Sequence, residues 1–176
     1  MKILYILIFS ISISFFSFAQ SKKRTFTQFE ITIPLKGNPN INEVYPDGRS
    51  NKTWFLPDGL SAKFGFGFHQ NKWIALGIHT GVDWKATEKL VAIPIYGNLK
   101  LSPKVGDEIR LFAQIGYGKS FAIGRGNLSG AYRKLSLGLQ DSNDVAIFIE
   151  IAEHQLAFNN YPKINTVSVG ICLTTF

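Results

Sequence analysis

The chain contains a single cysteine, Cys172, in 176 residues. One cysteine excludes an internal disulfide and a zinc site built from several thiolates. The three histidines, His69, His79 and His154, lack the spacing of a metal site, so we expect neither a metal nor a cofactor. The sequence also has no segment with a convincing 3.6-residue periodicity. These absences argue against a disulfide-stabilised domain, a metalloprotein and a helical bundle.

Long hydrophobic runs are also scarce, and the longest uncharged run lies at the N-terminus. It covers Ile3 to Phe18, after Met1-Lys2, and ends in the small-x-small site Ser17-Phe18-Ala19. Sixteen residues fall short of the ~20 that a spanning helix needs, whereas the layout is that of a secretory signal peptide cleaved before Gln20. We therefore predict a signal peptide at 1–19 and one mature domain at 20–176 without a transmembrane helix.

Basic residues outnumber acidic ones, and the full chain has a formal net charge of +7. The only basic cluster is Lys22-Lys23-Arg24, at the start of the mature chain. An exported protein without a clustered run of lysine and arginine is not expected to bind nucleic acid.

Strict alternation of apolar residues with small or polar residues is the main pattern in the sequence. Between Gly59 and Trp84, two alternating segments flank the polar break Gln70-Asn71-Lys72, which is typical of a β-hairpin. Six further segments alternate in the same way: 25–35, 90–101, 109–121, 131–140, 145–158 and 164–176. The pattern predicts eight strands, each with one hydrocarbon face and one face rich in glycine and polar residues.

Strands of about ten residues are long enough to cross a bilayer when tilted. Short connections after the second, fourth and sixth strands alternate with longer ones, of which 36–58 is the longest and is predicted to be a mobile surface loop. Outer-membrane barrels have this arrangement when both termini are periplasmic. We therefore predict an all-β fold: an eight-stranded antiparallel up-and-down transmembrane β-barrel preceded by a cleaved signal peptide.

Turn positions and Pro94 give finer expectations. A turn centred on Asn71 would place Lys63 near His79, and one centred on Ser142 would place Lys134 opposite Glu150. Pro94 lies inside a predicted strand and removes a ladder hydrogen bond, so we expect a bulge or local fraying there. Aromatic residues near the strand ends are predicted to form two interfacial girdles: Trp84, Phe121, Phe158 and Tyr161 at one end, and Phe26, Phe68, Trp73 and Phe176 at the other.

The signal peptide, the eight alternating strands and the terminal Phe176 resemble the small outer-membrane β-barrel proteins of Gram-negative bacteria, in the size class of the OmpX and OmpA transmembrane domains. The segments VAIPIYGNLKL and FAQIGYG, which end at Leu101 and Gly118, are similar to porin-like barrel domains of Bacteroidetes. The resemblance implies a monomer in the outer membrane with periplasmic termini, in contact with outer-membrane lipid and the assembly machinery.

One feature departs from the pattern of these barrels. Their assembly signal places the last Phe in phase with apolar residues, but the residues in phase with Phe176 are Thr174, Cys172 and Gly170. Either a bulge at Thr174-Thr175 restores the phase, or Phe176 is not a proper assembly signal.

The polar face would point into a lumen that side chains just fill in an eight-stranded barrel. The titratable residues predicted to line it are Glu30, Lys63, His79, Asp83, Lys100, Arg110, Lys134, Glu150 and His154, joined by Tyr96 and Gln114. Because buried charges must be paired or hydrated, we predict a polar network that plugs the lumen. A narrow ion path is the alternative.

Signals for catalysis are weak. The segment AQIGYGKS at 113–120 is one residue from a phosphate-binding loop, but it lies in an alternating strand. Lipid A deacylases of this size have a His-x-Ser motif, where this chain has His154-Gln155-Leu156; an arrangement of His154, Glu153 and Ser168 is an open alternative. We therefore expect a protein that is not an enzyme.

Surface contact is the role that the sequence favours: an integral outer-membrane barrel with a structural, adhesive or surface-interaction function. Basic residues of the predicted surface loops could bind lipopolysaccharide phosphates or could simply be solvated: Arg49, Lys52, Lys85, Lys89, Arg125 and Lys163. The alternatives are a secreted lipocalin-like barrel with an apolar ligand and a barrel enzyme that acts on lipid A.

Overall fold

The structure is a computed structural model, and it describes residues 24–44, 46–124, 128–156 and 163–176. This part of the chain is built from β-strands: β1 (Thr25–Gly37), β2 (Phe55–Pro57), β3 (Gly59–Gln70), β4 (Ile74–Lys85), β5 (Leu90–Leu101), β6 (Arg110–Ile123), β7 (Ser129–Gln140), β8 (Val145–His154) and β9 (Ile164–Thr175). Within it, no helix has the length and apolarity needed to span a bilayer. The predicted signal peptide at 1–19 and the predicted girdle residues Phe158 and Tyr161 lie outside the described residues.

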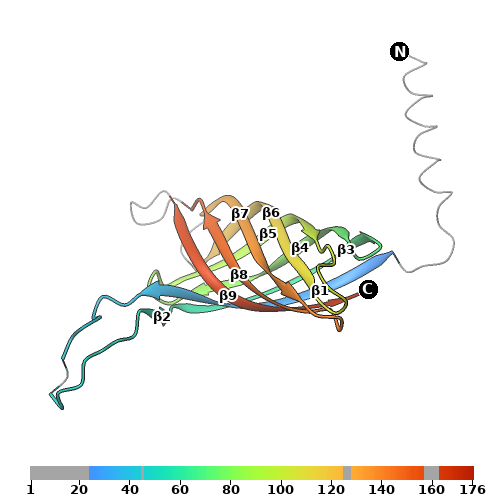
Figure 1. Ribbon diagram of the computed structural model, residues 1–176. Helices are drawn as coiled ribbons and strands as arrows, with labels where there is room; N and C mark the ends of the chain where they lie inside the picture. The colour runs from blue at the N-terminus through green and yellow to red at the C-terminus, as the bar shows by residue number, and fades with distance from the viewer. Residues whose placement is uncertain (1–23, 45, 125–127, 157–162) are drawn as a thin grey trace, which may run out of the picture.

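Eight of these strands form a closed antiparallel barrel (Figure 1). Each strand pairs with the next, and β1 pairs with both β3 and β9, so the sheet closes on itself. The short β2 pairs with the end of β1 and extends the first hairpin beyond the barrel. The prediction of an all-β, eight-stranded antiparallel barrel is confirmed.

The pairing registers give the stagger of the barrel. The cross-strand partners form one continuous path: Thr174, Gln28, Gly65, His79, Tyr96, Gly118, Tyr132, His154, Ile164. The path starts and ends on β9, at positions 174 and 164, so one circuit advances by 174 − 164 = 10 residues. Strands in such a barrel tilt by roughly 35–45°, and the interior of an eight-stranded barrel is only wide enough for side chains.

The two ends of the barrel differ. Thr25 and Thr175 lie at one end, which we name the terminal end. At the other end the first hairpin continues as an arm that projects past the rim (Figure 1). Backbone hydrogen bonds from Asn38 N–H to the Trp54 carbonyl, 2.9 Å, and from Asn42 N–H to the Asn51 carbonyl, 2.8 Å, hold the arm together. Part of the predicted loop 36–58 is therefore a paired extension of the sheet, and we name this end the arm end.

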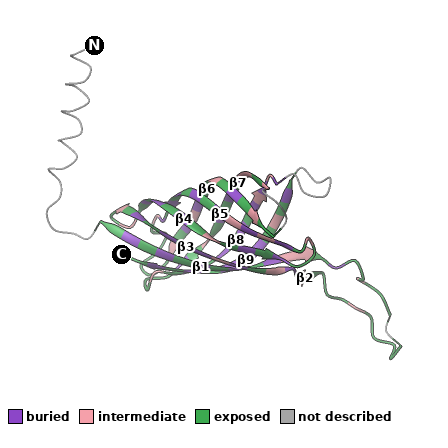
Figure 2. Ribbon diagram, turned by 180° about the vertical axis from the view of Figure 1, so that it is seen from behind, coloured by how far each residue is buried: buried purple, intermediate pink, exposed green. Residues whose placement is uncertain are grey.

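Alternating burial along every barrel strand separates the two faces (Figure 2). Phe64, Leu76 and Ile149 are 49%, 63% and 56% exposed on the outer wall, whereas Lys63 and Lys134 are buried inside. This is the orientation expected of a transmembrane barrel. A lipocalin-like barrel needs the reverse orientation, so that alternative is wrong.

Two predicted strand registers are wrong by two residues. Lys63 pairs with Gly81 and His79 with Gly65, and Lys134 pairs with Ala152 in place of Glu150. The β3–β4 turn is centred on Lys72, where Asn71 and Lys72 both have positive φ, and the β7–β8 turn on Asn143. A turn centre displaced by one residue moves every partner by two, which preserves the buried face but changes the pairs.

Pro94 disturbs the ladder only on one side. Its partner on β6 is Ser120 in an unbroken register, but the β4–β5 pairing is interrupted between Thr80–Ile95 and Asp83–Ala92. The register is the same on both sides of this gap. Local fraying is therefore found, and a register-shifting bulge is not, because the missing N–H of proline removes one hydrogen bond without displacing the strand.

Of the predicted girdle residues that the structure describes, all but Phe26 and Phe176 face outward. Trp84, Phe121, Phe68 and Trp73 are exposed on the outer wall. Phe26, in contrast, is 2% exposed inside the lumen, where its ring centroid lies 6.2 Å from that of Phe176. Phe26 is separated from Gln28 and Glu30 by even numbers of residues, so it points inward as they do. Its position in the strand, and not its aromatic character, determines which face it occupies.

Glycines on the inner wall make room for aromatic rings. A Cβ atom at Gly118 would lie 2.1 Å from the Ile95 carbonyl oxygen and 2.7 Å from the Tyr96 Cβ. A Cβ atom at Gly116 would lie 2.8 Å from the Tyr96 ring. Rings therefore pack flat across glycine positions of the neighbouring strand, which explains why the polar face of the sequence is rich in glycine.

We expect Gly118→Ala to lower the free energy of unfolding by about 1–3 kcal/mol, because a methyl group there forces the backbone of β5 to shift. Gly97→Ala is the matched control: Gly97 is exposed, and its nearest neighbour to an added Cβ is 3.9 Å away. The control should change stability by less than about 0.5 kcal/mol. Urea unfolding in detergent micelles measures both; equal effects would contradict the close packing of Tyr96 against β6.

Candidate functional site

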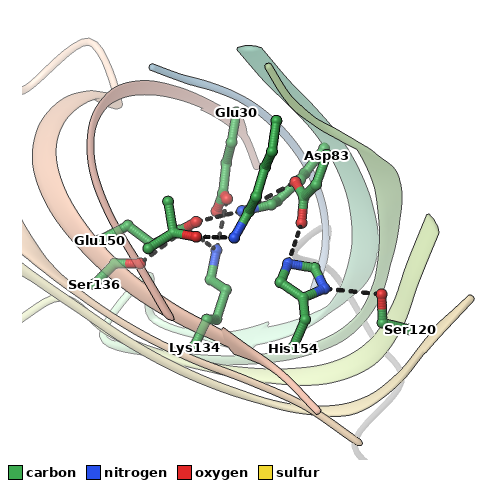
Figure 3. Close-up of polar contacts among 10 residues, drawn as sticks. Glu30, Asp83, Ser120, Lys134, Ser136, Glu150 and His154 are labelled. Atoms are coloured by element: carbon green, nitrogen blue, oxygen red, sulfur yellow. Dashed lines mark hydrogen bonds and ion pairs between the residues drawn. The ribbon is translucent and has the colours of Figure 1, made fainter. Parts of the chain in front are cut away.

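The centre of the lumen holds a network of buried ion pairs (Figure 3). Lys134 Nζ lies 2.6 Å from Glu30 Oε2 and 3.1 Å from Glu150 Oε2. Lys63 forms an ion pair with Glu150 and lies 3.8 Å from Asp83 Oδ1. These side chains come from five strands, β1, β3, β4, β7 and β8, and all are nearly inaccessible to solvent. The network therefore ties opposite walls of the barrel together across its axis.

A histidine links this network to a serine nearer the arm end. His154 Nε2 lies 3.1 Å from Asp83 Oδ2, and His154 Nδ1 lies 2.9 Å from Ser120 Oγ. With a second proton, His154 would donate to both partners and would bring the cations of the network to three, equal to its three carboxylates. The order Ser120, His154, Asp83 is also that of a nucleophile, a base and an orienting carboxylate. All three residues are buried, so the same contacts serve to satisfy polar groups inside the barrel.

Four aromatic rings pack in sequence along the lumen wall. The centroid distances are 5.4 Å from His79 to Tyr96, 5.0 Å from Tyr96 to Tyr132, and 4.9 Å from Tyr132 to His154. Lys134 Nζ lies 5.4 Å from the Tyr96 centroid, within the range of a cation–π contact. The rings and the ion pairs therefore lie side by side inside the lumen.

An apolar cluster closes the lumen at the arm end. It consists of Leu90, Ala92, Leu156 and Ile164, with Ala122 and Leu128 packed against it. Leu90 and Leu156 are 1% and 0% exposed. We name this cluster the apolar cap. It lies directly beyond His154, whose cross-strand partner is Ile164.

The terminal end is closed by aromatic and basic side chains. The Phe176 ring lies 4.6 Å from the ring of His69, and Lys72 Nζ is 4.7 Å from the Phe176 centroid. Lys100 Nζ is 5.4 Å from the same centroid and donates a hydrogen bond to Thr174 Oγ1 at 2.7 Å. Behind these residues lies a second apolar cluster: Phe112, Ala146, Phe148 and Cys172.

The last strand settles the phase of Phe176. Thr174 and Cys172 are buried on the lumen side, and β9 pairs with β1 in one unbroken register up to Thr175. A bulge at Thr174-Thr175, one of the two possibilities that the sequence allowed, is therefore absent from this pairing. Phe176 contacts the mouth of the lumen on the same side as Thr174.

A cavity of about 190 Å³ opens beside this mouth. Its lining residues are Lys72, Lys104, Asp107, Glu108, Arg110, Ser142 and Asp144. Lys72 and Asp144 form an ion pair at 2.6 Å, and Arg110 lies 3.4 Å from the Lys72 carbonyl oxygen. Three cations face three carboxylates, so the cavity has no preference for one sign of charge.

Almost every predicted lumen residue lies inside the barrel. The structure brings together Glu30, Lys63, Asp83, Lys134, Glu150 and His154 in the central network. His79 belongs to the ring series, Lys100 to the terminal mouth, and Arg110 to the partly exposed rim of that mouth.

Lys85, Ser120 and the apolar cap escaped the sequence-based prediction. Lys85 was expected in a surface loop, but β4 continues through it, and its buried ammonium donates to Thr166 Oγ1. Its phase with Asp83 on β4 could have shown this. The cap residues are apolar but occupy inward positions near the strand ends. In a search for alternation between apolar and polar residues, they look like interruptions of the pattern.

We expect Lys134→Met to lower the free energy of unfolding by about 3–5 kcal/mol, because it leaves two carboxylates in the lumen without their shared cation. Adding Glu30→Gln should restore part of the loss, since Glu150 retains Lys63 as a partner. Arg133→Met is the control, because Arg133 is the next residue and faces outward with an exposed, long ion pair. Urea unfolding of wild type, the single variants Lys134→Met and Glu30→Gln, the double variant and the control gives the coupling energy; additive effects would contradict the network.

Comparisons with known proteins identify the fold alone. No family model matches the chain, and no curated protein matches it. Among solved structures, the outer membrane enzyme PagL superposes with a TM-score of 0.52 at 13% identity, covering 84% of this chain and 98% of that one. Neisserial surface protein A superposes with a TM-score of 0.51 at 8% identity, covering 86% and 97%. This chain thus has the fold of eight-stranded outer-membrane β-barrels.

Proposed function

We propose that this protein is an integral outer-membrane β-barrel of a Gram-negative bacterium, with a plugged lumen and a structural or surface-interaction role. The observation that carries the proposal is the apolar outer wall: all eight barrel strands expose aliphatic or aromatic side chains outward. Soluble monomers rarely expose a contiguous apolar patch larger than a few hundred Å². A wall of this kind around a closed hydrogen-bond ladder fits a hydrocarbon surrounding.

The arm end is proposed to face the outside, with both termini in the periplasm. The projecting arm lies at that end, as the long loops of outer-membrane barrels do. A signal peptide at 1–19 would direct export. The resemblance to porin-like barrels of Bacteroidetes remains a prediction about origin.

The proposed membrane location also implies the partners of the protein. Outer-membrane lipid covers the wall, and the assembly machinery inserts the barrel. Because Phe176 packs at the mouth of the lumen, we propose that recognition by that machinery does not depend on an outward-facing terminal ring. Closure leaves no strand edge in the barrel wall for lateral pairing, which favours a monomer.

The membrane location is tested by fractionation combined with gel mobility. The protein should be enriched in the outer-membrane fraction, and the folded form should migrate differently before and after boiling. Recovery in the soluble periplasmic fraction, with no change in mobility on boiling, would refute the membrane proposal.

The plugged lumen predicts that the folded protein carries no steady ionic current. The support for it is that the ion network, the ring series and the apolar cap consist of inward side chains that are almost inaccessible to solvent. In planar bilayers at 1 M KCl, insertion should therefore give no stable conductance step. An open channel that persists in wild-type protein would contradict the plug while leaving the membrane proposal intact.

A lipid-hydrolysing enzyme is the second candidate, because Ser120, His154 and Asp83 are connected in the order that a nucleophile needs. The apolar cap lies over them, and Ser120 is fully buried. We therefore expect no fatty acid release when folded protein is incubated with lipid A or phospholipid micelles, as measured by mass spectrometry. Release that Ser120→Ala abolishes, with folding retained, would overturn this expectation.

A further inference from the structure

Charged residues interrupt the apolar outer wall at one place, near the arm end of β6 to β9. Lys119 and Arg133 face outward on β6 and β7, and Glu153 and Lys163 face outward at the ends of β8 and β9. These four strands are consecutive in the barrel wall (Figure 1). Charges on a lipid-facing wall destabilise a barrel unless they lie near the interface and have partners. The presence of this charged patch on the wall therefore calls for a physical explanation.

Lys119 is a cation on the apolar wall without a carboxylate partner among the residues that the structure describes. Its neighbours along β6 are Tyr117 and Phe121, and its cross-strand partner on β5 is Ile95, all exposed on the apolar wall. In the described part of the chain, no carboxylate lies within ion-pair distance of Lys119. Its other cross-strand partner is Ala131, whose side chain is a single methyl group.

One carboxylate is shared by the two remaining cations. Glu153 lies 3.9 Å from the Arg133 guanidinium and 3.5 Å from Lys163 Nζ. Gln155 donates a further hydrogen bond to Glu153 at 2.7 Å. The patch therefore has three cations and one anion, an excess of two positive charges.

The residues around Ala131 are arranged as in a binding site for an anionic group. Lys119 lies across from Ala131 on β6, Gln155 follows the end of β8 and donates its backbone N–H to the Ala131 carbonyl, and Arg133 follows two residues along β7. The Arg133 guanidinium is 5.9 Å from the Tyr117 ring, a contact that holds the guanidinium against the wall. Lysine and arginine are the side chains that bind phosphate oxygens most strongly.

We propose that this patch binds the phosphorylated sugar headgroup of a lipid A-type glycolipid in the outer leaflet, with a phosphate over Ala131 between Lys119 and Arg133. The inference rests on the proposed membrane location and orientation, which place the arm end in the outer leaflet. Two features favour a phosphorylated sugar over a simple phospholipid: the excess positive charge, and the neutral hydrogen-bonding groups of Gln155, Asn165 and Tyr117 on the same surface. The apolar wall below the patch would contact the acyl chains.

The test is native mass spectrometry of the full folded barrel in detergent, titrated with bisphosphorylated lipid A. The double variant Lys119→Gln/Arg133→Gln should bind at least fivefold less lipid A than wild type. Lys104→Gln, an exposed cation at the terminal end, is the matched control and should bind as wild type does. Dephosphorylated lipid A should bind wild type at least fivefold more weakly.

Two competitors separate the sources of phosphate. An excess of inorganic phosphate should not displace lipid A, and phosphatidylglycerol should displace it only at much higher concentration. Equal binding by the double variant, or equal competition by phosphatidylglycerol, would overturn the glycolipid site. Failure of the membrane proposal itself has a different signature, because wild type and variants alike would then lack the mobility shift on boiling.

Discussion

The pairing of β1 with β9 is the constraint on which the rest of the structure depends. Nine residue pairs, from Thr27–Thr175 to Leu35–Val167, close the sheet and leave no free strand edge in the wall. In hydrocarbon every backbone N–H and C=O needs a partner within the protein, and a closed ladder is the only way for strands to meet this requirement. Closure with eight strands and a stagger of ten residues makes the interior narrow, so every inward side chain competes for the same space. The glycines beside Tyr96 and the flat packing of the rings are consequences of that narrowness.

The ion network favours the native strand register, which the apolar wall alone does not distinguish from a shifted one. If one strand slipped by two residues, its hydrocarbon face would still point outward and its polar face inward, so the hydrophobic effect hardly distinguishes the two registers. The buried ion pairs do distinguish them. Lys134 and Glu30 are 104 residues apart in the chain, and Lys63 and Glu150 are 87 apart, so these contacts form only when the strands between them have the native register. The alternative register would leave charges unpaired in a closed interior, which is strongly unfavourable.

The sequence predicted the barrel well because a period of two is set by strand geometry alone. The number of strands, the inward position of Lys63 and the outward position of Phe64 all follow from that period. Pair identities depend on turn conformation, and the positive φ values at Asn71 and Lys72 were not visible in the pattern. For the same reason the contact between His154 and Ser120 was missed: they lie on β8 and β6, two strands apart, and no local pattern connects them.

The same period also shows where the outward face of two strands stops being apolar. Along most of β8 and β9 the apolar residues face outward, as Ile151 and Val167 do. One step nearer the arm end the outward residues become Glu153 and Asn165, while the inward residues become Leu156 and Ile164 of the apolar cap. A reversal of this kind is unfavourable inside a bilayer, because it exposes polar groups to lipid. It is favourable where the outer wall meets headgroups and the lumen must be closed against water. On the proposed membrane location, the boundary on these two strands would lie between Ile151 and Glu153 and between Val167 and Asn165, and Glu153 would meet lipid headgroups.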